Sequence, residues 1–342
     1  MAVFPRFAAS ALAAALAVPL LAGCETLAYY VQAISGQLTL MARARPVAEL
    51  LADRATPQPL RARLELAREI RDYAVRELKL PDNASYRSYA ELDGPYAVWN
   101  VVAAPEFSLE PLQSCFPVAG CVSYRGFFGP DDAGRYAQGL RAQGYDVYVY
   151  GVPAYSTLGR FDDPLLSTFI RYPDADLARL VFHELTHQVA YVKDDSTFNE
   201  SFAVTVEREG VRRWLAATGR AAELKAFFAA EEKNRKFAAE IDQARARLNV
   251  LYRQRIAPEA MRERKRAEYA ALKKALEASP RFGNAEPNNA LLASYATYTE
   301  LVTEFELILK ENNDNLEAFY AQVKRYAANA PSNRGPLSMP SR

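Results

Sequence analysis

Two histidines that stand four residues apart have the spacing needed to bind one metal ion. The chain has 342 residues and two histidines, His183 and His187, both within LARLVFHELTHQVAYVK at 177–193. Residues four apart project from the same face of a helix, so both imidazoles can reach one ion. Glu184 points about a third of a turn away, where its carboxylate can take a proton from a metal-bound water. The HExxH pattern therefore indicates a zinc site that performs hydrolysis.

The segment before the motif predicts the helix that such a site requires. YPDADLARLVF, at 172–182, offers Asp174 or Asp176 as the helix N-cap and apolar residues such as Leu177 and Val181 for packing. An isolated histidine is more often a hydrogen-bonded residue of the core than a metal ligand. Because that alternative must place both histidines of the chain at ligand spacing by chance, we favour the metal site.

A catalytic zinc ion needs a third protein ligand and a position that stays open to water. No histidine remains, so this ligand must be Asp, Glu or Cys. In KDDSTFNESFAVTVEREG, at 193–210, Ser196 or Thr197 is expected to cap a second helix that carries Glu200 in its first turn. Glu200 is our candidate ligand, and the alternative is an acidic residue favoured there by the helix dipole. Glu207 lies about two turns further on, where it would either support a ligand or face solvent.

The elements that must position these residues are mostly helical. Apolar residues recur at helical spacing in two N-terminal segments, 26–53 and 60–80, and turn residues follow at 81–86. Two segments rich in Val and Tyr, 96–105 and 144–156, predict strands. The predicted fold class is therefore α+β, predominantly helical, with a small β-sheet packed beside the zinc helix.

From Pro173 onward the chain is expected to be almost wholly helical. The charged segment 223–274 interleaves basic and acidic residues with apolar ones, which predicts two antiparallel solvated helices broken near Pro258. Lys and Arg total 42 against 41 Asp and Glu, so no overall field favours nucleic acid. We expect no nucleic-acid partner, and any other partner must be recognised by a specific site.

The N-terminus predicts export and a membrane anchor. In MAVFPRFAASALAAALAVPLLAGC, Arg6 precedes an apolar run at 7–22 that is short for a transmembrane helix and typical of a signal peptide. The run ends in LAGC, which resembles the lipobox of bacterial lipoproteins, and Cys24 would then carry the lipid; the alternative is a plain signal peptide that contains a cysteine. By the same resemblance, Glu25 favours the outer membrane. We expect a lipid-anchored protein of the bacterial envelope that faces the periplasm.

Cys115 and Cys121, in SCFPVAGCVSY, are the two cysteines outside this signal. In an oxidising periplasm, cysteines that close so short a loop most simply form a disulfide. A metal pair is the weaker alternative, because no second cluster of Cys or His is present to complete a tetrahedral site.

Several segments resemble known zinc peptidases. HELTHQ followed by FNESFA is similar to the gluzincin metallopeptidases, in which two His and a Glu on the next helix hold zinc, and NESFA is similar to the Asn-Glu-Gly-Phe-Ala segment of the large zinc aminopeptidases. The ensemble of YYVQAISGQLTL, CFPVAGCVSYRGFF, AYSTLGRFDDPLLSTFI, HELTHQ, STFNESFA and NNALLASYATY resembles a family of bacterial lipoproteins described as aminopeptidases. The resemblance implies a gluzincin-like catalytic core, one Zn2+ ion held by His183, His187 and Glu200, and a peptide or protein substrate.

The chain departs from the large aminopeptidases in two respects. Only 12 residues, 188–199, separate His187 from Glu200, which excludes an inserted lid. No Gly-x-Met-Glu-Asn segment is present to capture the free amine of a substrate. The resemblance implies a zinc aminopeptidase, and these departures leave two alternatives open. One is a metalloendopeptidase that acts on envelope proteins, and the other is a zinc-binding scaffold lipoprotein without turnover. Retention of Glu184 argues against the scaffold, because a structural site needs no proton acceptor.

Further assignments concern the oxyanion donor, the substrate strand and the domains. Tyr295 and Tyr298 are weak candidates for the donor that stabilises the oxyanion, since most tyrosines serve packing. The strand segment 144–156 would either pair with an extended peptide substrate or be an ordinary internal strand. The predicted divisions are the signal peptide, the N-terminal helices with sheet and zinc-binding core, a C-terminal helical region, and a flexible tail: 1–23, 24–220, 221–330 and 331–342.

Overall fold

The computed structural model describes residues 29–116, 120–154, 156–277 and 286–328. The predicted signal peptide, Cys24 and the predicted tail lie outside the described residues. The chain divides into two compact units, Met1–Arg43 and Ala44–Arg342. In the first unit, a helix spans 29–42. None of the helices in the described ranges combines the length and apolar character that a membrane span requires.

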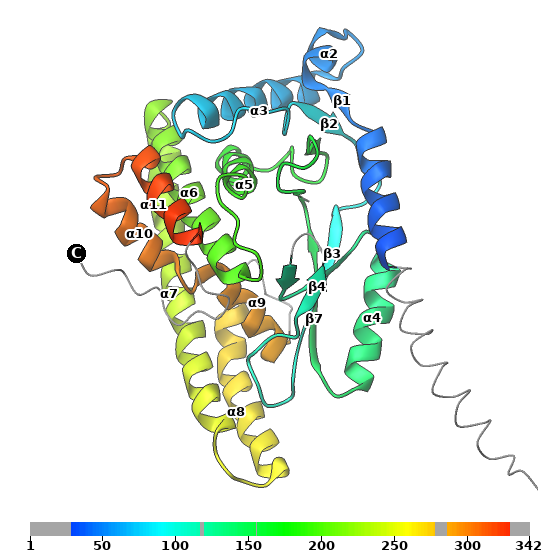
Figure 1. Ribbon diagram of the computed structural model, residues 1–342, viewed down its shortest axis with the longest axis vertical. Helices are drawn as coiled ribbons and strands as arrows, with labels where there is room; N and C mark the ends of the chain where they lie inside the picture. The colour runs from blue at the N-terminus through cyan, green and yellow to red at the C-terminus, as the bar shows by residue number, and fades with distance from the viewer. Residues whose placement is uncertain (1–28, 117–119, 155, 278–285, 329–342) are drawn as a thin grey trace, which may run out of the picture. The chain divides into compact units, whose positions relative to one another are not determined.

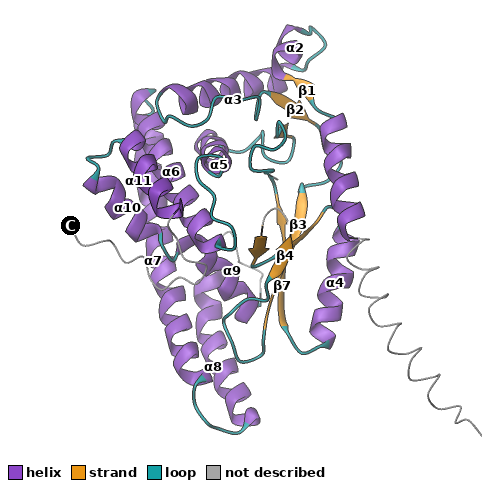
Figure 2. Cartoon of the chain, in the orientation of Figure 1, coloured by secondary structure: helices purple, strands orange, loops and turns teal. Residues whose placement is uncertain are grey.

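The main sheet of the second unit has the strand order β6-β3-β7, and Figure 2 labels its two long strands, β3 and β7. Strands β3 (Val98–Ala104) and β7 (Asp146–Val152) pair antiparallel along their whole length, and β6 (Arg125–Phe127) pairs with the other side of β3. Both strands that the sequence predicted are confirmed. Because β3 is central, its residues are almost all buried, whereas β7 lies at the edge of this sheet.

Five short strands form two smaller sheets. The first has the order β1-β2-β8, with strands Arg45–Pro46, Ser88–Ala90 and Leu165–Leu166. The second is a hairpin of β4 (Ser114–Phe116) and β5 (Gly120–Val122). The prediction of continuous helical spacing over 26–53 was wrong at β1. Pro46 fixes its own backbone in an extended conformation, so it ends β1 and caps the next helix, α2 (Val47–Ala52).

Ten labelled helices make helix the predominant element of the described second unit, as the α+β prediction expected. Their bounds are α2 (Val47–Ala52), α3 (Gln58–Arg76), α4 (Pro130–Ala142), α5 (Asp174–Thr186), α6 (Ser196–Ala217), α7 (Ala221–Tyr252), α8 (Pro258–Glu277), α9 (Asn289–Thr299), α10 (Val302–Glu311) and α11 (Leu316–Ala328). The helical hairpin predicted around Pro258 is confirmed as α7 and α8, which pack together.

Helix α5 runs through the middle of the second unit, seen along its axis in Figure 1, with α3 and α6 packed against it. Its apolar face is fully buried and includes Phe182 and Leu185. Gly210 of α6 permits a close approach here, because a Cβ at that position would lie 2.8 Å from the Phe182 ring. Helix α9 packs on both α6 and the strands β3 and β7, so it joins the helical layer to the sheet.

The predicted helix caps were wrong for both α5 and α6. Pro173 occupies the N-cap of α5 with no side-chain hydrogen bond, and Asp174 instead binds Arg63 and Arg220. Asp195 caps α6, where its carboxylate accepts a hydrogen bond of 2.9 Å from the backbone N–H of Phe198. Ion pairs with distant arginines thus replaced the local cap at the start of α5.

Candidate metal centre

The last turn of α5 presents both histidines to the same point. His183 lies inside the helix, and His187 is its C-cap residue with backbone angles that are still helical. Their Nε2 atoms lie 3.2 Å apart, and the planes of the two rings are nearly perpendicular, at 84°. The helical spacing of four residues therefore brings the two imidazoles together, as the sequence predicted.

Glu200, from the second turn of α6, completes the group. Its Oε2 lies 3.2 Å from Nε2 of His183 and 3.9 Å from Nε2 of His187. A tetrahedral zinc site with bonds of about 2.0–2.2 Å has neighbouring ligand atoms roughly 3.3 Å apart. The donor set and these separations fit one ion, and the three ligand atoms all lie within 4.8 Å of one another. The side chains of His183 and Glu200 keep 13% of their surface exposed.

Glu207 supports His183 from behind. Its Oε2 lies at a hydrogen-bond distance of 2.7 Å from Nδ1 of His183, so the carboxylate holds the imidazole with Nε2 facing Glu200 and His187. The other oxygen of Glu207 lies 3.9 Å from Nε of Arg179, whose guanidinium also binds Glu231 of α7 at 3.0 Å. Of the two interpretations of Glu207, support of a ligand is the one that agrees with the structure.

The protonation of the two histidines differs because their neighbours differ. Burial lowers the pKa of His183, but hydrogen bonds with Glu200 and Glu207 outweigh it and hold this pKa well above its usual value. Burial lowers the pKa of His187 to about 4, so its imidazole is neutral. The pair of carboxylates around His183 therefore favours positive charge at this point, which suits a cation.

Glu184 is placed as a proton acceptor. Burial raises its pKa to about 7. The neighbouring His183 lowers this pKa, and the carboxylates of Glu200 and Asp163 raise it. A carboxyl with this pKa can both accept and release a proton near neutral pH. Asp163 lies in the loop after β7 and is itself buried; its carboxylate holds that loop through the backbone N–H and the hydroxyl of Thr157.

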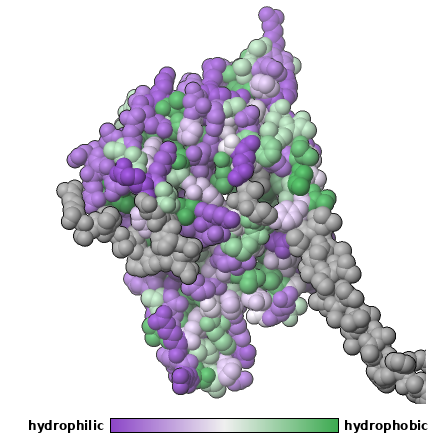
Figure 3. Space-filling model, viewed as in Figure 1, coloured by the Kyte–Doolittle hydropathy of each residue, from purple (hydrophilic) through white to green (hydrophobic). Residues whose placement is uncertain are grey.

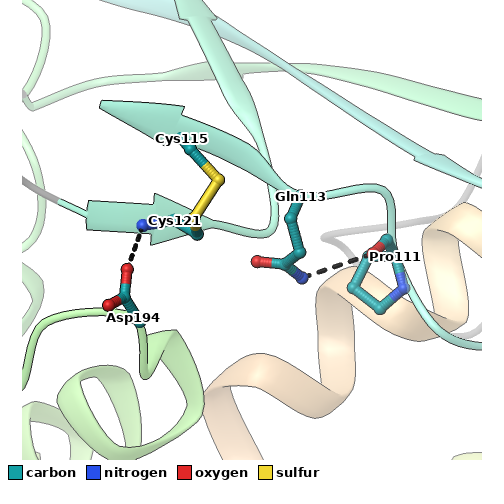
Figure 4. The surroundings of a disulfide bond; sticks show 5 residues. All are labelled: Pro111, Gln113, Cys115, Cys121 and Asp194. Carbon is teal, nitrogen blue, oxygen red and sulfur yellow. Dashed lines mark hydrogen bonds between the residues drawn. A yellow bond between two sulfur atoms is a disulfide. The ribbon is translucent and has the colours of Figure 1, made fainter. Parts of the chain in front are cut away.

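A disulfide hairpin contacts the loop that joins the two ligand-bearing helices. Cys115 and Cys121 are bonded across β4 and β5, and the backbone N–H of Cys121 donates a 2.5 Å hydrogen bond to the Asp194 carboxylate (Figure 4). Gly120 has a φ of 78°, and a Cβ there would lie 2.4 Å from the same carboxylate. Asp194 is itself in the left-handed region, with a φ of 67°, so the hairpin stabilises a tight turn between His187 and Glu200.

Asn199, next to Glu200, fixes the other end of this loop. Its side-chain oxygen accepts from the backbone N–H of Val192 at 2.7 Å, and its amide donates to the Val192 carbonyl at 2.8 Å. The side chain is buried, so these two bonds are shielded from water. Asn199 was not among the residues predicted from the sequence, although its place beside the predicted ligand was a usable signal.

Two tyrosines that were not predicted from the sequence, Tyr124 and Tyr191, lie near Glu200. Tyr295 packs against Phe237 in a hydrophobic cluster formed with α7 and α8, with ring centroids 5.4 Å apart. By contrast, burial and the nearby Glu200 carboxylate raise the pKa of Tyr124 well above its usual value and also raise the pKa of Tyr191. Both phenols therefore stay protonated and can donate a hydrogen bond. Sequence periodicity gives no signal for Tyr124, which lies between β5 and β6.

Comparison with known proteins gives one family. No match was found among curated proteins or among solved structures. A family model described as "Putative aminopeptidase" matches residues 28–336, which include α5, α6 and all three candidate ligands. This match spans most of the chain, and the protein therefore belongs to the family of that description.

Proposed function

We propose that this protein is a zinc-dependent peptide hydrolase of the aminopeptidase type, anchored by lipid in the bacterial envelope. The observation that carries the proposal is the convergence of His183, His187 and Glu200 at ligand spacing, with the buried carboxyl of Glu184 on the same helix. The family description gives the substrate class, a peptide. Two imidazoles and one carboxylate leave a fourth position open, which suits catalysis better than a structural role.

Glu184 and two tyrosines are the residues to which we assign roles in the reaction. A zinc ion, when bound, polarises a substrate carbonyl and makes water more acidic. Glu184 takes the proton of the attacking water and returns it to the nitrogen of the leaving amine. Tyr124 and Tyr191, protonated and close to Glu200, are the candidate donors to the negative charge on the carbonyl oxygen.

Strand β7 is the candidate binding edge for the substrate. It lies at the edge of the main sheet, and the loop that follows it reaches Ser156, whose hydroxyl hydrogen bonds with Glu184. A peptide added to this edge would run toward the metal ligands. Asn288 covers the beginning of the strand, where its amide donates to the Val147 carbonyl, so a peptide would have to pair further along β7.

The anchoring rests on the sequence around Cys24. The apolar segment, the LAGC sequence and Glu25 support a lipid on Cys24, a periplasmic position and the outer membrane. The disulfide between Cys115 and Cys121 is compatible with such an oxidising compartment.

One experiment tests the proposal. Bound metal and hydrolysis of aminoacyl reporters and N-blocked peptides are measured for the wild type and for Glu184→Gln, with Glu223→Gln at an exposed position as the matched control. We expect one zinc per chain in all three proteins, and loss of hydrolysis by at least about 100-fold in Glu184→Gln alone. Zinc-replete wild type that hydrolyses no peptide would contradict the proposal and favour the scaffold.

A metalloendopeptidase is the second candidate function. It is favoured by the absence of the amine-binding segment of the large aminopeptidases and by the short connection between His187 and Glu200. Hydrolysis of N-blocked peptides without hydrolysis of aminoacyl reporters would select this function over the aminopeptidase.

A further inference from the structure

The helix at 29–42 has an exposed aliphatic stripe. The side chains of Val31, Ile34 and Leu38 are 58%, 59% and 60% exposed. Spacings of three and four residues place them on one face, and Ala42 continues the stripe by one more turn. In the space-filling view, hydrophobic residues in green lie along this helix, which is dark blue in Figure 1 (Figure 3). Such a stripe is unusual on a surface that contacts only water.

The composition of the helix separates it from the other exposed apolar residues. From Tyr29 to Ala42 the sequence contains no charged residue, and the first charges that follow are Arg43 and Arg45. Among the other described residues, the large exposed apolar side chains form no such stripe: Phe228 and Val250 lie several turns apart on α7, and Leu307 lies on α10. Single exposed apolar residues are normal, whereas an ordered stripe on an uncharged helix indicates a nonaqueous partner.

We propose that the stripe of Val31, Ile34 and Leu38 binds the surface of a phospholipid bilayer, with the helix lying in the plane of the headgroups. This rests on the lipid anchor proposed above. Four residues, 25–28, separate Cys24 from the helix, so a lipid on Cys24 would hold Tyr29 within about 17 Å of the membrane surface, at roughly 3.4 Å per residue. At that distance the uncharged, apolar face of the helix can reach the surface of the bilayer.

The length and the ends of the helix agree with this position. A helix that lies in the interface buries its apolar face about 5–10 Å deep, which three aliphatic side chains on one face can reach. Two tyrosines, Tyr29 and Tyr30, begin the helix, and tyrosine favours the boundary between lipid and water. Arg43 and Arg45 follow its end, which suits anionic headgroups. The helix would thus add a second contact with the membrane beside the lipid.

The test measures the contribution of the helix to membrane binding in a protein that carries no lipid. The mature chain, residues 24–342, is prepared as Cys24→Ser so that it carries no lipid, and its sedimentation with vesicles of phosphatidylethanolamine and phosphatidylglycerol is measured. The same protein with Val31→Gln, Ile34→Gln and Leu38→Gln is compared with it. A matched control carries Phe228→Gln, Val250→Gln and Leu307→Gln, whose side chains are 51%, 63% and 55% exposed.

We expect the Cys24→Ser protein and the matched control to bind vesicles equally, and the helix variant to bind at least about 10-fold more weakly. Circular dichroism should show that all three proteins stay folded. Absence of vesicle binding by the Cys24→Ser protein, or equal binding by the helix variant, would overturn the inference. Labelling of the native chain with a fatty acid tests the anchor separately, so failure of the anchor and failure of the helix give different results.

Discussion

Replacement of Glu207 by glutamine should weaken metal binding without unfolding the protein. Glu207 Oε2 lies at a hydrogen-bond distance of 2.7 Å from His183 Nδ1, and the other oxygen of Glu207 lies 3.9 Å from Nε of Arg179. Glutamine can keep one acceptor toward His183 but has no negative charge. The imidazole of His183 would then be a weaker electron donor at Nε2 and would be held less firmly in its orientation.

The expected loss follows from this one contact. A hydrogen bond to a charged partner contributes about 1.5–3 kcal/mol, and glutamine should retain the part that needs no charge. Loss of an outer partner of a metal-bound histidine typically lowers metal affinity about 10- to 100-fold, or about 1.4–2.7 kcal/mol. We therefore expect about 10-fold for Glu207→Gln and close to 100-fold for Glu207→Ala, which removes the acceptor altogether.

Glu209→Gln provides the matched control on the same helix. The side chain of Glu209 is 12% exposed against 11% for Glu207, but it binds Arg212 and Arg213 and does not contact the histidines. Zinc affinity is measured by competition with a chromophoric chelator, and folding is measured by urea denaturation of the metal-free proteins. We expect a loss of affinity in Glu207→Gln and unchanged affinity in Glu209→Gln. Equal affinities in all three proteins would refute the role assigned to Glu207.

Three further perturbations should change stability, each measured by urea denaturation. Gly210→Ala should destabilise the fold by about 1–3 kcal/mol, because its Cβ would overlap Phe182; a neutral result would contradict the close packing of α5 and α6. Replacing Cys115 and Cys121 by serine should cost roughly 2 kcal/mol, and reductant should have no further effect on that variant. Burial raises the pKa of Asp163 to about 6, so the folded state keeps a proton that the unfolded state loses, and this carboxyl reduces stability as pH rises from about 4 to 6. The free energy of unfolding should therefore change less with pH between about 4 and 6 in Asp163→Asn than in the wild type. An equal pH dependence in both proteins would contradict the raised pKa of Asp163.

Some parts of the site were predictable because they depend on local spacing. The distance of four residues between His183 and His187 sets their geometry in any helix, and Glu200 followed from the need for a third ligand on the next helix. The two long strands were also predictable, since Val and Tyr between turn residues favour strands. These features need little information from the rest of the chain.

Other parts depend on contacts between distant residues and have no local signal. The sequence predicted Asp174 as a helix N-cap, but its carboxylate instead accepts hydrogen bonds from Arg63 and Arg220. Arg63 precedes Asp174 by 111 residues. Tyr124 comes close to Glu200 only through the packing of the β5–β6 connection. Periodicity and capping preferences describe neighbours in sequence, so they cannot predict these contacts.

The disulfide hairpin shows how a feature remote in sequence can support the candidate metal site. The loop between His187 and Glu200 is short, and Asp194 must adopt a left-handed conformation that costs free energy for a residue with a side chain. The Cys121 N–H, which donates to Asp194, and the two hydrogen bonds of Asn199 to Val192 offset that cost. Since the loop sets where α6 begins, these contacts also set the position of Glu200 relative to the histidines. The cysteines therefore stabilise the position of Glu200, the third candidate ligand, although neither cysteine is itself a candidate ligand.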